Sequence, residues 1–582
     1  FSVGDGSAVQ NFHAAHVTGT VIASGVDPLA KGMAPKASAV GYDWNNDEAE
    51  VTAAAANGML ISNHSYGFAV RDEDNQPLLP AYYFGGYTNE SRTWDNIAYN
   101  APYYLMVVAA GNEGIDNSVN PDPLGGESAF DKLTGHATSK NNLVIANGND
   151  ATINTDGKLV SVTVSSGSSE GPTDDFRVKP DLMGNGTDLY SSYDSSDSAY
   201  NSSSGTSMAS PNVAGSLLLL QQYYNETHGS FMKASTLKGL ALHTADDVAP
   251  EGPDAASGWG LMNAKKAAET VTKKGFQSII SEIELINEST YTVVVKSDGI
   301  RPLSASISWT DLPGVANTGV VNDPTPVLVQ DLDIKVTNSS GETTATFLPW
   351  KLTSVNTNEK GDNIVDPYER VDIENASGEY TITISHKGTL QGGAQKVSLI
   401  VTGVSSGIAL LTSQSNQTSC DNSVTFDFNY AETIGGTTVF SVSGLPTNAN
   451  VNLSNSSMSS DGNFTATADI VVDGIVGGIQ PGSIVSGDGV VEGTTVISFD
   501  QDTSTITMST VQTLIDSTLL TIGEPKFYVY NYQSKKPFKT LPENELIRVY
   551  DKIPVKAFGQ EIISNRVVYS NFQDKHTPPS TL

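Results

Sequence analysis

The chain has 582 residues, more than one compact domain usually holds. Its formal net charge of −32 argues against binding to nucleic acid or to anionic membrane surfaces. No run of about 18 apolar residues occurs, so no membrane-spanning helix is expected. The single cysteine, Cys420, excludes a disulfide within the chain.

The first region, residues 1–270, alternates short apolar runs with helical patterns. Continuous apolar runs within 104–110 and 142–146 are typical of strands buried on both faces of a parallel sheet. Helical periodicity is found at about 50–58, 208–224 and 233–243. We therefore expect an α/β domain with a mainly parallel sheet.

The pattern changes to period two over residues 275–403. Alternating segments separated by Gly, Asn and Asp predict an antiparallel β-sandwich. The predicted strands fall at 290–296, 304–309, 331–337 and 379–385.

Three further segments follow, and none carries a chemical motif. Residues 408–470 predict an Ig-like β segment, with strands at 424–428 and 438–442. Residues 471–524 predict a small Gly/Val-rich β module. In the tail, 525–582, basic residues outnumber acidic ones, against the trend of the chain. The tail is either a new domain or a joining artefact, and it loosely resembles phage structural proteins.

The strongest chemical signal is Ser207, in the run Gly205-Thr-Ser-Met-Ala-Ser-Pro211. A Gly-rich loop enters a predicted helix here, which places the hydroxyl near unpaired backbone N–H groups. A serine nucleophile needs a base, a group that orients the base, and donors for the oxyanion. The alternative interpretation is an ordinary N-cap serine.

Two other stretches contain residues of the required types. Asn112 follows a predicted strand at a Gly-Asn turn, in Val107-Val-Ala-Ala-Gly-Asn-Glu-Gly114. This places its amide at the carboxyl edge of the sheet, where α/β active sites lie. His13 and His16 occur in His13-Ala-Ala-His-Val-Thr-Gly-Thr20. Metal binding by this histidine pair lacks a third ligand at a helical spacing.

Together these runs resemble the signatures of the subtilisin-like serine peptidases (subtilases), in the family's chain order. The resemblance implies that Ser207 is the nucleophile, His13 the general base and Asn112 the oxyanion donor, with His16 structural. Further stretches match at 32–37, 168–172, 179–181 and 258–264, with Glu170 where Arg is common. Residues 275–403 resemble the C-terminal jelly-roll (P-domain-like) module of some bacterial subtilases.

The resemblance also implies where a peptide substrate binds. A peptide would add as a strand along two edge segments of the chain. The implied substrate-binding residues are Ser65, Tyr66, Gly67, Ala110 and Gly111. His64, in the first segment, is either a wall residue or a second base, and we expect a wall residue.

The orienting acid of the triad is missing from the expected place. Subtilases carry it tens of residues before the histidine, but only twelve residues precede His13. Asp5-Gly6 lies too close to His13, so Asp5 is expected to be a loop residue. We expect the sequence to be truncated before the catalytic Asp and the signal peptide, so that this chain by itself is inactive or weakly active.

The resulting expectation is a secreted or cell-surface bacterial serine endopeptidase acting on proteins or peptides. It would need no cofactor for its chemistry. The alternative is a catalytically dead protein whose β modules bind a surface or a virion. Structural calcium is a further hypothesis, with oxygen ligands in the sandwich, against the alternative of an acidic solvated face. The candidate ligands are Asp323, Asp331, Asp333, Asp362 and Asp366.

Overall fold

The computed structural model describes residues 1–7, 11–248, 250–275, 277–340 and 343–405, and beyond residue 405 mainly separate strand segments between 409 and 574. It divides into two compact units. The first comprises 1–416, 426–441 and 453–468, and the second 417–425, 442–452 and 469–582. All sites discussed below lie in the first unit.

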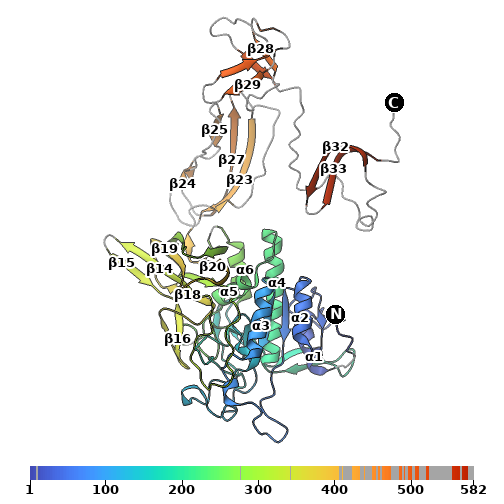
Figure 1. Cartoon of the computed structure of the whole chain (residues 1–582), viewed down its shortest axis with the longest axis vertical. Coiled ribbons are helices and arrows are strands. Elements are labelled where there is room, and N and C mark those ends of the chain that lie inside the picture. Colours follow the sequence, from blue (N-terminus) through green and yellow to red (C-terminus); the bar gives the residue numbers. More distant parts are fainter. Residues whose placement is uncertain are drawn as a thin grey trace. The chain divides into compact units, whose positions relative to one another are not determined.

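A four-stranded parallel sheet forms the centre of the α/β part (Figure 1). Its strands, in spatial order, are β3 (Ile61–His64), β4 (Leu105–Ala109), β5 (Leu143–Gly148) and β8 (Leu182–Asn185). The two apolar runs predicted to be buried strands are β4 and β5. The expected parallel sheet is confirmed.

Alternate residues of β4 face opposite sides of the sheet. Leu105 and Val107 belong to a buried core that includes residues of α4 (Thr206–His228). Met106 and Val108 belong to a second core with residues of α2 (Asp47–Ala56) and α3 (Asn89–Asn100). Because helices cover both faces, the strand is apolar throughout rather than alternating.

The predicted helices are present, with somewhat different ends. They are α2 (Asp47–Ala56), α4 and α5 (Ala234–Thr244). The other helices are α1 (Phe12–Ile22), α3 (Asn89–Asn100) and α6 (Ala264–Thr272). Helix α1 packs against α4, which brings the helix of His13 beside the helix of Ser207.

A short separate sheet lies near the start of the chain. In it β1 (Ser2–Val3) pairs in parallel with β2 (Val40–Gly41). Within the described residues, β2 pairs only with β1 and β3 pairs only with β4, so each has an open edge. Asp5 follows β1 and accepts backbone hydrogen bonds from Ser7 and Asp43, which confirms it as a loop residue.

Two antiparallel sheets follow the α/β part. The first has the order β11 (Ile279–Ile286), β20 (Ala394–Thr402), β13 (Leu303–Ser308) and β18 (Tyr368–Ile373). The second has the order β15 (Thr343–Phe347), β14 (Leu332–Ser340), β19 (Glu379–His386), β12 (Tyr291–Ser297) and β21 (Val404–Ser405). Both contribute to one buried apolar core, so they form the expected sandwich.

The sandwich is joined tightly to the α/β part. Helix α5 packs on β13 and β20, and Ile400 of β20 lies in the core beneath the parallel sheet. The Lys140 ammonium, fully buried, donates to Asp311 Oδ2 at 2.5 Å across this joint. The two parts therefore share buried polar and apolar contacts within one compact unit.

The remaining strands are short or stand apart from these sheets. In the first 405 residues they are β6 (Thr152–Ile153), β7 (Leu159–Ser161), β9 (Leu189–Ser192), β10 (Tyr200–Ser203), β16 (Trp350–Ser354) and β17 (Thr357–Lys360). Beyond them are β22 (Ala409–Leu410), β23 (Ser423–Glu432), β24 (Thr438–Val439), β25 (Ala449–Leu453), β26 (Ser457–Met458), β27 (Gly462–Val472), β28 (Ile484–Gly487), β29 (Val496–Asp500), β30 (Thr505–Met508), β31 (Leu520–Gly523), β32 (Pro554–Ile563) and β33 (Arg566–Asp574). Strands β23 and β24 lie where strands were predicted. Much of the three predicted segments after residue 408 falls outside the described residues.

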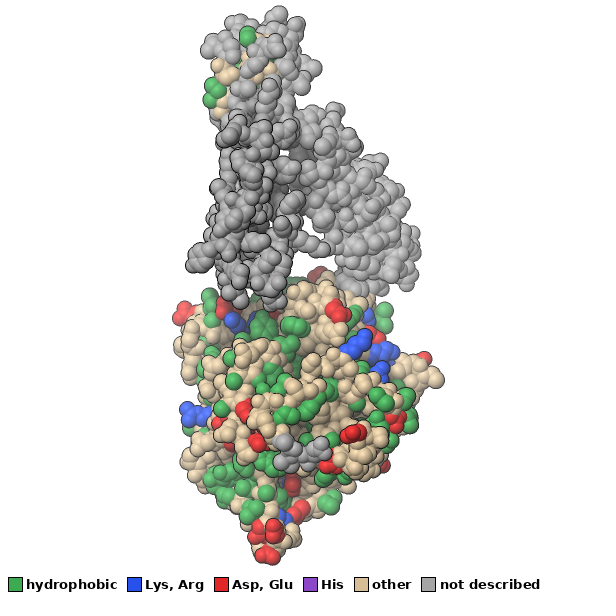
Figure 2. Space-filling view, turned by 90° about the vertical axis from the view of Figure 1, so that its right-hand side faces the viewer, with side chains coloured by type: hydrophobic (Ala, Val, Ile, Leu, Met, Phe, Trp, Pro, Cys, Tyr) green, Lys and Arg blue, Asp and Glu red, His purple; other side chains and the backbone are tan. Residues whose placement is uncertain are grey.

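The described surface is of mixed character. On the face shown in Figure 2, hydrophobic side chains are scattered among polar ones, and Lys and Arg form only small groups. In the described part of the chain, no helix has the length and apolar character that a bilayer crossing needs.

Candidate active site

Ser207 lies in the first turn of α4, at the position that the sequence predicted. The helix begins at Thr206, and its N-cap is Gly205 with φ of 150°. A Cβ on residue 205 would lie 3.2 Å from Asn112 Oδ1, so glycine lets the loop pass close to Asn112. Since the cap is Gly205, the N-cap interpretation of Ser207 is wrong.

Asn112 is held by the same helix start. Its Oδ1 accepts hydrogen bonds from the Thr206 amide at 3.0 Å and the Thr206 hydroxyl at 3.1 Å. An amide N–H can only donate, so the oxygen end of the side chain must face Thr206. Among the described contacts, the Asn112 Nδ2 group has no hydrogen bond, which leaves it available as a donor.

Both side chains border one cavity of about 110 Å³. Its lining comes from the ends of β3 and β4, the start of α4 and the segment around residue 136. The lining residues are Tyr66, Gly67, Phe68, Ala109, Ala110, Gly111, Asn112, Glu113, Thr134, His136, Ala137, Thr206 and Ser207. Four of the five predicted substrate-binding residues are among them.

Ser65 is the exception among the predicted substrate-binding residues. It does not line the cavity, but it forms hydrogen bonds with Ser207, the candidate nucleophile. The Ser207 hydroxyl donates to the Ser65 carbonyl at 3.2 Å, and the Ser65 hydroxyl donates to the Ser207 carbonyl at 2.9 Å. These reciprocal bonds tie the end of β3 to the first turn of α4.

His13 lies in the first turn of α1, where the Asn11 side chain caps the helix by accepting from the His13 amide. Partial burial, and next the charge of His16, hold the pKa of His13 below its usual range. Among the described residues, the His13 ring has no hydrogen bond to Ser207 or to a carboxylate. His16 is buried with Nε2 2.9 Å from the Leu189 carbonyl oxygen, as a structural residue would be.

His64 lies behind the cavity wall in a buried hydrogen-bond chain. The Tyr66 hydroxyl donates to Asp47 Oδ2 at 2.6 Å, so it accepts from His64 Nδ1 at 2.7 Å. His64 Nε2 therefore accepts from Ser62 Oγ at 2.6 Å, and Ser62 in turn accepts from the Tyr104 hydroxyl at 2.7 Å. Burial lowers the pKa of His64 to about 3, so the ring is neutral and acts as a structural link, not a second base.

Glu113 and Ser169 also support the site; both lie in stretches that resemble the family, but the sequence assigned neither a role. Glu113 Oε2 accepts from the Asn112 amide at 2.8 Å and from the Ser169 hydroxyl at 2.7 Å. The Glu113 amide donates to Ser169 Oγ at 3.0 Å. These bonds join segments 56 residues apart, and no local spacing signals such a contact.

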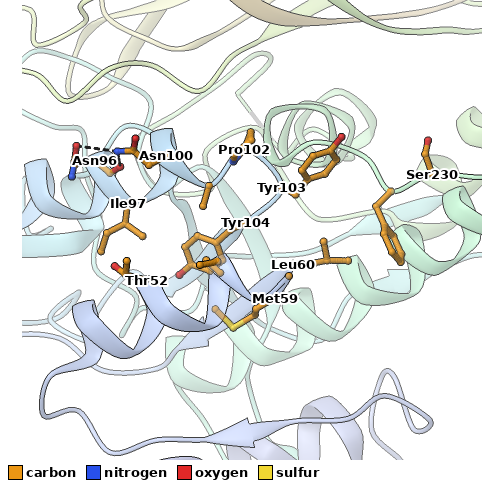
Figure 3. Close-up of a pocket in the computed structure, with 15 residues that line it drawn as sticks. Thr52, Met59, Leu60, Asn96, Ile97, Asn100, Pro102, Tyr103, Tyr104 and Ser230 are labelled. Atoms are coloured by element: carbon orange, nitrogen blue, oxygen red, sulfur yellow. Dashed lines mark hydrogen bonds between the residues drawn. The ribbon is translucent and has the colours of Figure 1, made fainter. Parts of the chain in front are cut away.

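A larger cavity, of about 830 Å³, lies elsewhere, between α2, α3 and the loop after α4 (Figure 3). It shares no lining residue with the cavity at Ser207. Its lining holds no charged or histidine side chain, so it offers no acid, base or nucleophile beyond hydroxyl groups. The smaller cavity, by contrast, is lined by the ionisable side chains of Glu113 and His136 together with Ser207.

Most calcium candidates of the sandwich already have protein partners. Lys387 Nζ lies 3.2 Å from Asp331, 2.8 Å from Asp333 and 2.6 Å from Asp362. Asp366 is buried and accepts from the Val178 amide and the Asn363 side chain. Across the described residues, no group of three or more His, Cys, Asp or Glu side chains is arranged to hold a metal ion.

The family comparison agrees with the fold and with the motifs. The model of the subtilase family, Peptidase_S8, matches residues 4–260. Over these residues the chain matches the subtilase family, which supports a serine peptidase in general terms.

Individual relatives match over short stretches. The C5a peptidase of Streptococcus pyogenes is 34% identical over 146 residues, which are 22% of this chain and 12% of that protein. Serotype-specific antigen 1 of Mannheimia haemolytica is 28% identical over 106 residues, 18% of this chain and 10% of that protein. The chain thus matches about a tenth of the length of these curated relatives.

Solved structures give distant matches. The patellamide maturation protease PatA is 20% identical, with a TM-score of 0.33, over 46% of this chain and 95% of that chain. The prenylagaramide maturation protease PagA is 18% identical, with a TM-score of 0.33, over 46% of this chain and 86% of that chain.

Proposed function

We propose that the chain carries the catalytic serine of a serine endopeptidase, which forms an acyl-enzyme at Ser207. The observation that carries the proposal is the shared cavity of Ser207 and Asn112, with Thr206 orienting the amide. Ser207 Oγ would attack the scissile carbonyl, and Asn112 Nδ2 would donate to the oxyanion that develops. The family match over residues 4–260 supports this chemistry.

His13 is the proposed general base. Its lowered pKa favours the neutral imidazole, which is the form that accepts the Ser207 proton. For this step the Ser207 hydroxyl must leave the Ser65 carbonyl and turn toward His13. Hydrogen bonds between catalytic groups often form only once substrate is bound, so the present rotamer is compatible with the role.

The orienting acid is the part of the triad without a candidate. No carboxylate contacts the His13 ring among the described residues, and Asp5 is bonded to Ser7 and Asp43 instead. Without an acid, the imidazole loses its fixed tautomer, and kcat falls by about 10⁴. We propose that the triad is completed by a carboxylate other than those whose contacts the structure describes. The chain by itself is proposed to have residual activity only.

The proposed substrates are proteins and peptides bound in extended form. The end of β3 continues into Tyr66-Gly67, and the end of β4 into Ala110-Gly111, so both segments offer backbone groups beside Ser207. A cavity of about 110 Å³ accommodates one side chain next to the scissile bond.

Secretion or surface display is the proposed location. The sandwich is proposed to have a jelly-roll topology.

The alternative is a catalytically dead surface-binding or virion-associated protein. It is favoured by one observation, the absence of a carboxylate partner for His13 among the described residues. The two proposed functions differ in whether the site hydrolyses peptide bonds, so a hydrolysis assay decides between them.

Hydrolysis of chromogenic peptides over many hours, with product masses determined, tests the proposal. We expect slow cleavage that Ser207→Ala abolishes. Ser210→Ala is the matched control, because Ser210 is the next serine of α4 and its hydroxyl donates to Asn63 Oδ1. Cleavage that survives Ser207→Ala, or no cleavage by the folded wild type, would favour the alternative.

A further inference from the structure

The cavity beside Ser207 adjoins one side of the proposed substrate only. Ser207 and Asn112 both line it, and His13 does not. On the proposed function, the scissile carbonyl lies between Ser207 and Asn112, and this carbonyl belongs to the residue before the scissile bond. The leaving amine departs toward His13, which returns the proton to it. The cavity therefore receives the side chain of the residue before the scissile bond.

The aromatic ring of Phe68 occupies the space in front of Gly135. Phe68 lines the cavity, and so do Thr134 and His136, the two neighbours of Gly135 in the chain. A Cβ added at Gly135 would lie 2.3 Å from Phe68 Cε2 and 2.6 Å from Phe68 Cδ2. Gly135 has φ of 56°, in the left-handed region that glycine adopts without strain. The missing side chain at residue 135 thus leaves room that the ring of Phe68 takes.

Two contacts hold Phe68 in this position. Its ring meets the ring of Tyr83 edge to face, with 6.2 Å between the ring centroids. His136 Nε2 donates to the Tyr66 carbonyl at 2.8 Å, which fixes the backbone two residues before Phe68. Phe68 is still 41% exposed, so a bound peptide can contact it.

The space that remains in the cavity is small. Its volume is about 110 Å³. An engineered protein cavity of ~150 Å³ binds benzene, so the present space is less than an aromatic ring needs. Forcing a larger group into a packed site costs free energy, because neighbouring side chains and backbone must shift. Side chains of the size of Ala, Ser, Thr and Val fit this space, whereas those of Phe, Tyr and Trp do not.

The size of the cavity matters more than its charge. The ionisable side chains in the lining are Glu113 and His136, and both have protein partners. Glu113 Oε2 accepts from the Asn112 amide and from the Ser169 hydroxyl. His136 donates to the Tyr66 carbonyl. Because both groups are already engaged, size is the main criterion for the incoming side chain.

We propose that Phe68 is a specificity-determining residue, which restricts the residue before the scissile bond to small uncharged side chains. The inference rests on the proposed function and adds the substrate class: extended segments in which Ala, Ser, Thr or Val precedes the cleaved bond. Truncation of Phe68 joins the space in front of Gly135 to the cavity, so that an aromatic side chain fits. One methylene group is worth about 10–200-fold in such a pocket, so the exclusion of a whole ring should exceed tenfold.

Binding of peptides to the inactive Ser207→Ala chain tests the cavity without any need for hydrolysis. The probes are two fluorophore-labelled hexapeptides that differ only in their last residue, Ala or Phe, and fluorescence anisotropy gives their Kd values. We expect the Ala peptide to bind at least about tenfold more tightly than the Phe peptide. In Ser207→Ala/Phe68→Ala the Phe peptide should gain at least about tenfold and become the tighter ligand.

Phe231→Ala, added to Ser207→Ala, is the matched control. Phe231 is 43% exposed and lines the other, larger cavity, so its truncation should leave the ratio of the two Kd values unchanged. Equal affinity for the two peptides, a ratio that Phe68→Ala does not alter, or no binding of either peptide overturns the proposal.

A second measurement needs no substitution at Phe68, and it separates this inference from the proposed function. A mixture of unfolded proteins is incubated with the wild-type chain, and mass spectrometry identifies the residue before each cut that Ser207→Ala abolishes. We expect Ala, Ser, Thr and Val at most of these positions. Cuts mainly after Phe, Tyr or Trp overturn the role of Phe68 and leave the serine peptidase intact. No cutting, together with the expected ratio of Kd values, contradicts the proposed function and supports the preference of the cavity.

Discussion

The backbone N–H of Thr206 donates to Asn112 Oδ1 at 3.0 Å, and this bond joins the start of α4 to the end of β4. It turns the amide nitrogen of Asn112 away from Thr206, at the rim of the cavity that Ser207 also lines. The bond therefore couples the position of the proposed oxyanion donor to the helix that carries the proposed nucleophile.

Asn112→Asp should remove the oxyanion donor. The loss of one such donor lowers kcat by about 10²–10³ and leaves KM nearly unchanged, because the bond is made mainly in the transition state. Hydrolysis of a peptidyl ester measures both constants. Asn96→Asp, an exposed change on α3, should leave kcat at the wild-type value; an equal loss in both variants would exclude the proposed role of Asn112.

Tyr66→Phe should break the buried hydrogen-bond chain behind the cavity wall. Asp47 loses a donor and the His64 Nδ1–H group loses its acceptor. We expect the free energy of unfolding to fall by about 1–3 kcal/mol, measured by urea denaturation. Tyr103→Phe is the control, since the Tyr103 side chain is 45% exposed and should tolerate the change. Equal stability of the two variants would show that this series of buried hydrogen bonds does not stabilise the folded protein.

Lys140→Met should weaken the joint between the α/β part and the sandwich. The substitution leaves the buried Asp311 carboxylate without its ammonium partner, and we expect a loss of about 3–5 kcal/mol in urea denaturation. The double variant Lys140→Met/Asp311→Asn should recover part of this loss. Lys351→Met removes the more exposed pair with Glu359 and should cost less than about 1 kcal/mol. A Lys140 effect as small as that of Lys351 contradicts this account of the joint.

His243 should make stability depend on pH. Burial, and next the charge of Arg370, lowers the pKa of His243 to about 3 in the folded chain, against about 6.5 in the unfolded chain. Between these values the unfolded chain binds a proton that the folded chain does not, so the free energy of unfolding falls as pH falls. The contribution lost by pH 5 is on the order of 2 kcal/mol.

His243→Gln isolates this contribution from the other titrating groups. Gln can still hydrogen bond to Ser306 and Thr402, which contact the two ring nitrogens. We expect the stability difference between wild type and variant to shift in favour of the variant as pH falls from 6.5 to 5. A difference that stays constant over this range would mean that His243 does not titrate on unfolding.

Local sequence patterns predicted the elements well, because burial and periodicity act along the chain. The apolar run at 104–110 became β4, and the position of Ser207 at a helix start was correct. Contacts between distant segments carry no such signal. The bonds of Glu113 to Ser169 and of Lys140 to Asp311 depend on tertiary packing.

The same limit applies to three expectations about single residues. His64 was expected in the wall, but it lies behind Tyr66, because its ring nitrogens bond to side chains of β3 and the following turn. Ser65 was expected to contact substrate; in the structure it bonds to Ser207 and does not line the cavity, and its contact with substrate stays a prediction. The sandwich aspartates were proposed for calcium, and three of them share Lys387, a residue far from them in the sequence.

The most direct test of the central claim is covalent labelling with a fluorophosphonate, followed by mass spectrometry of the digested chain. The account predicts one adduct, on the peptide that contains Ser207, formed slowly and with a rate that falls further in His13→Ala. It also predicts no adduct in Ser207→Ala and an unchanged rate in Ser210→Ala. A folded wild type that stays unlabelled, or an adduct that persists in Ser207→Ala, would contradict it.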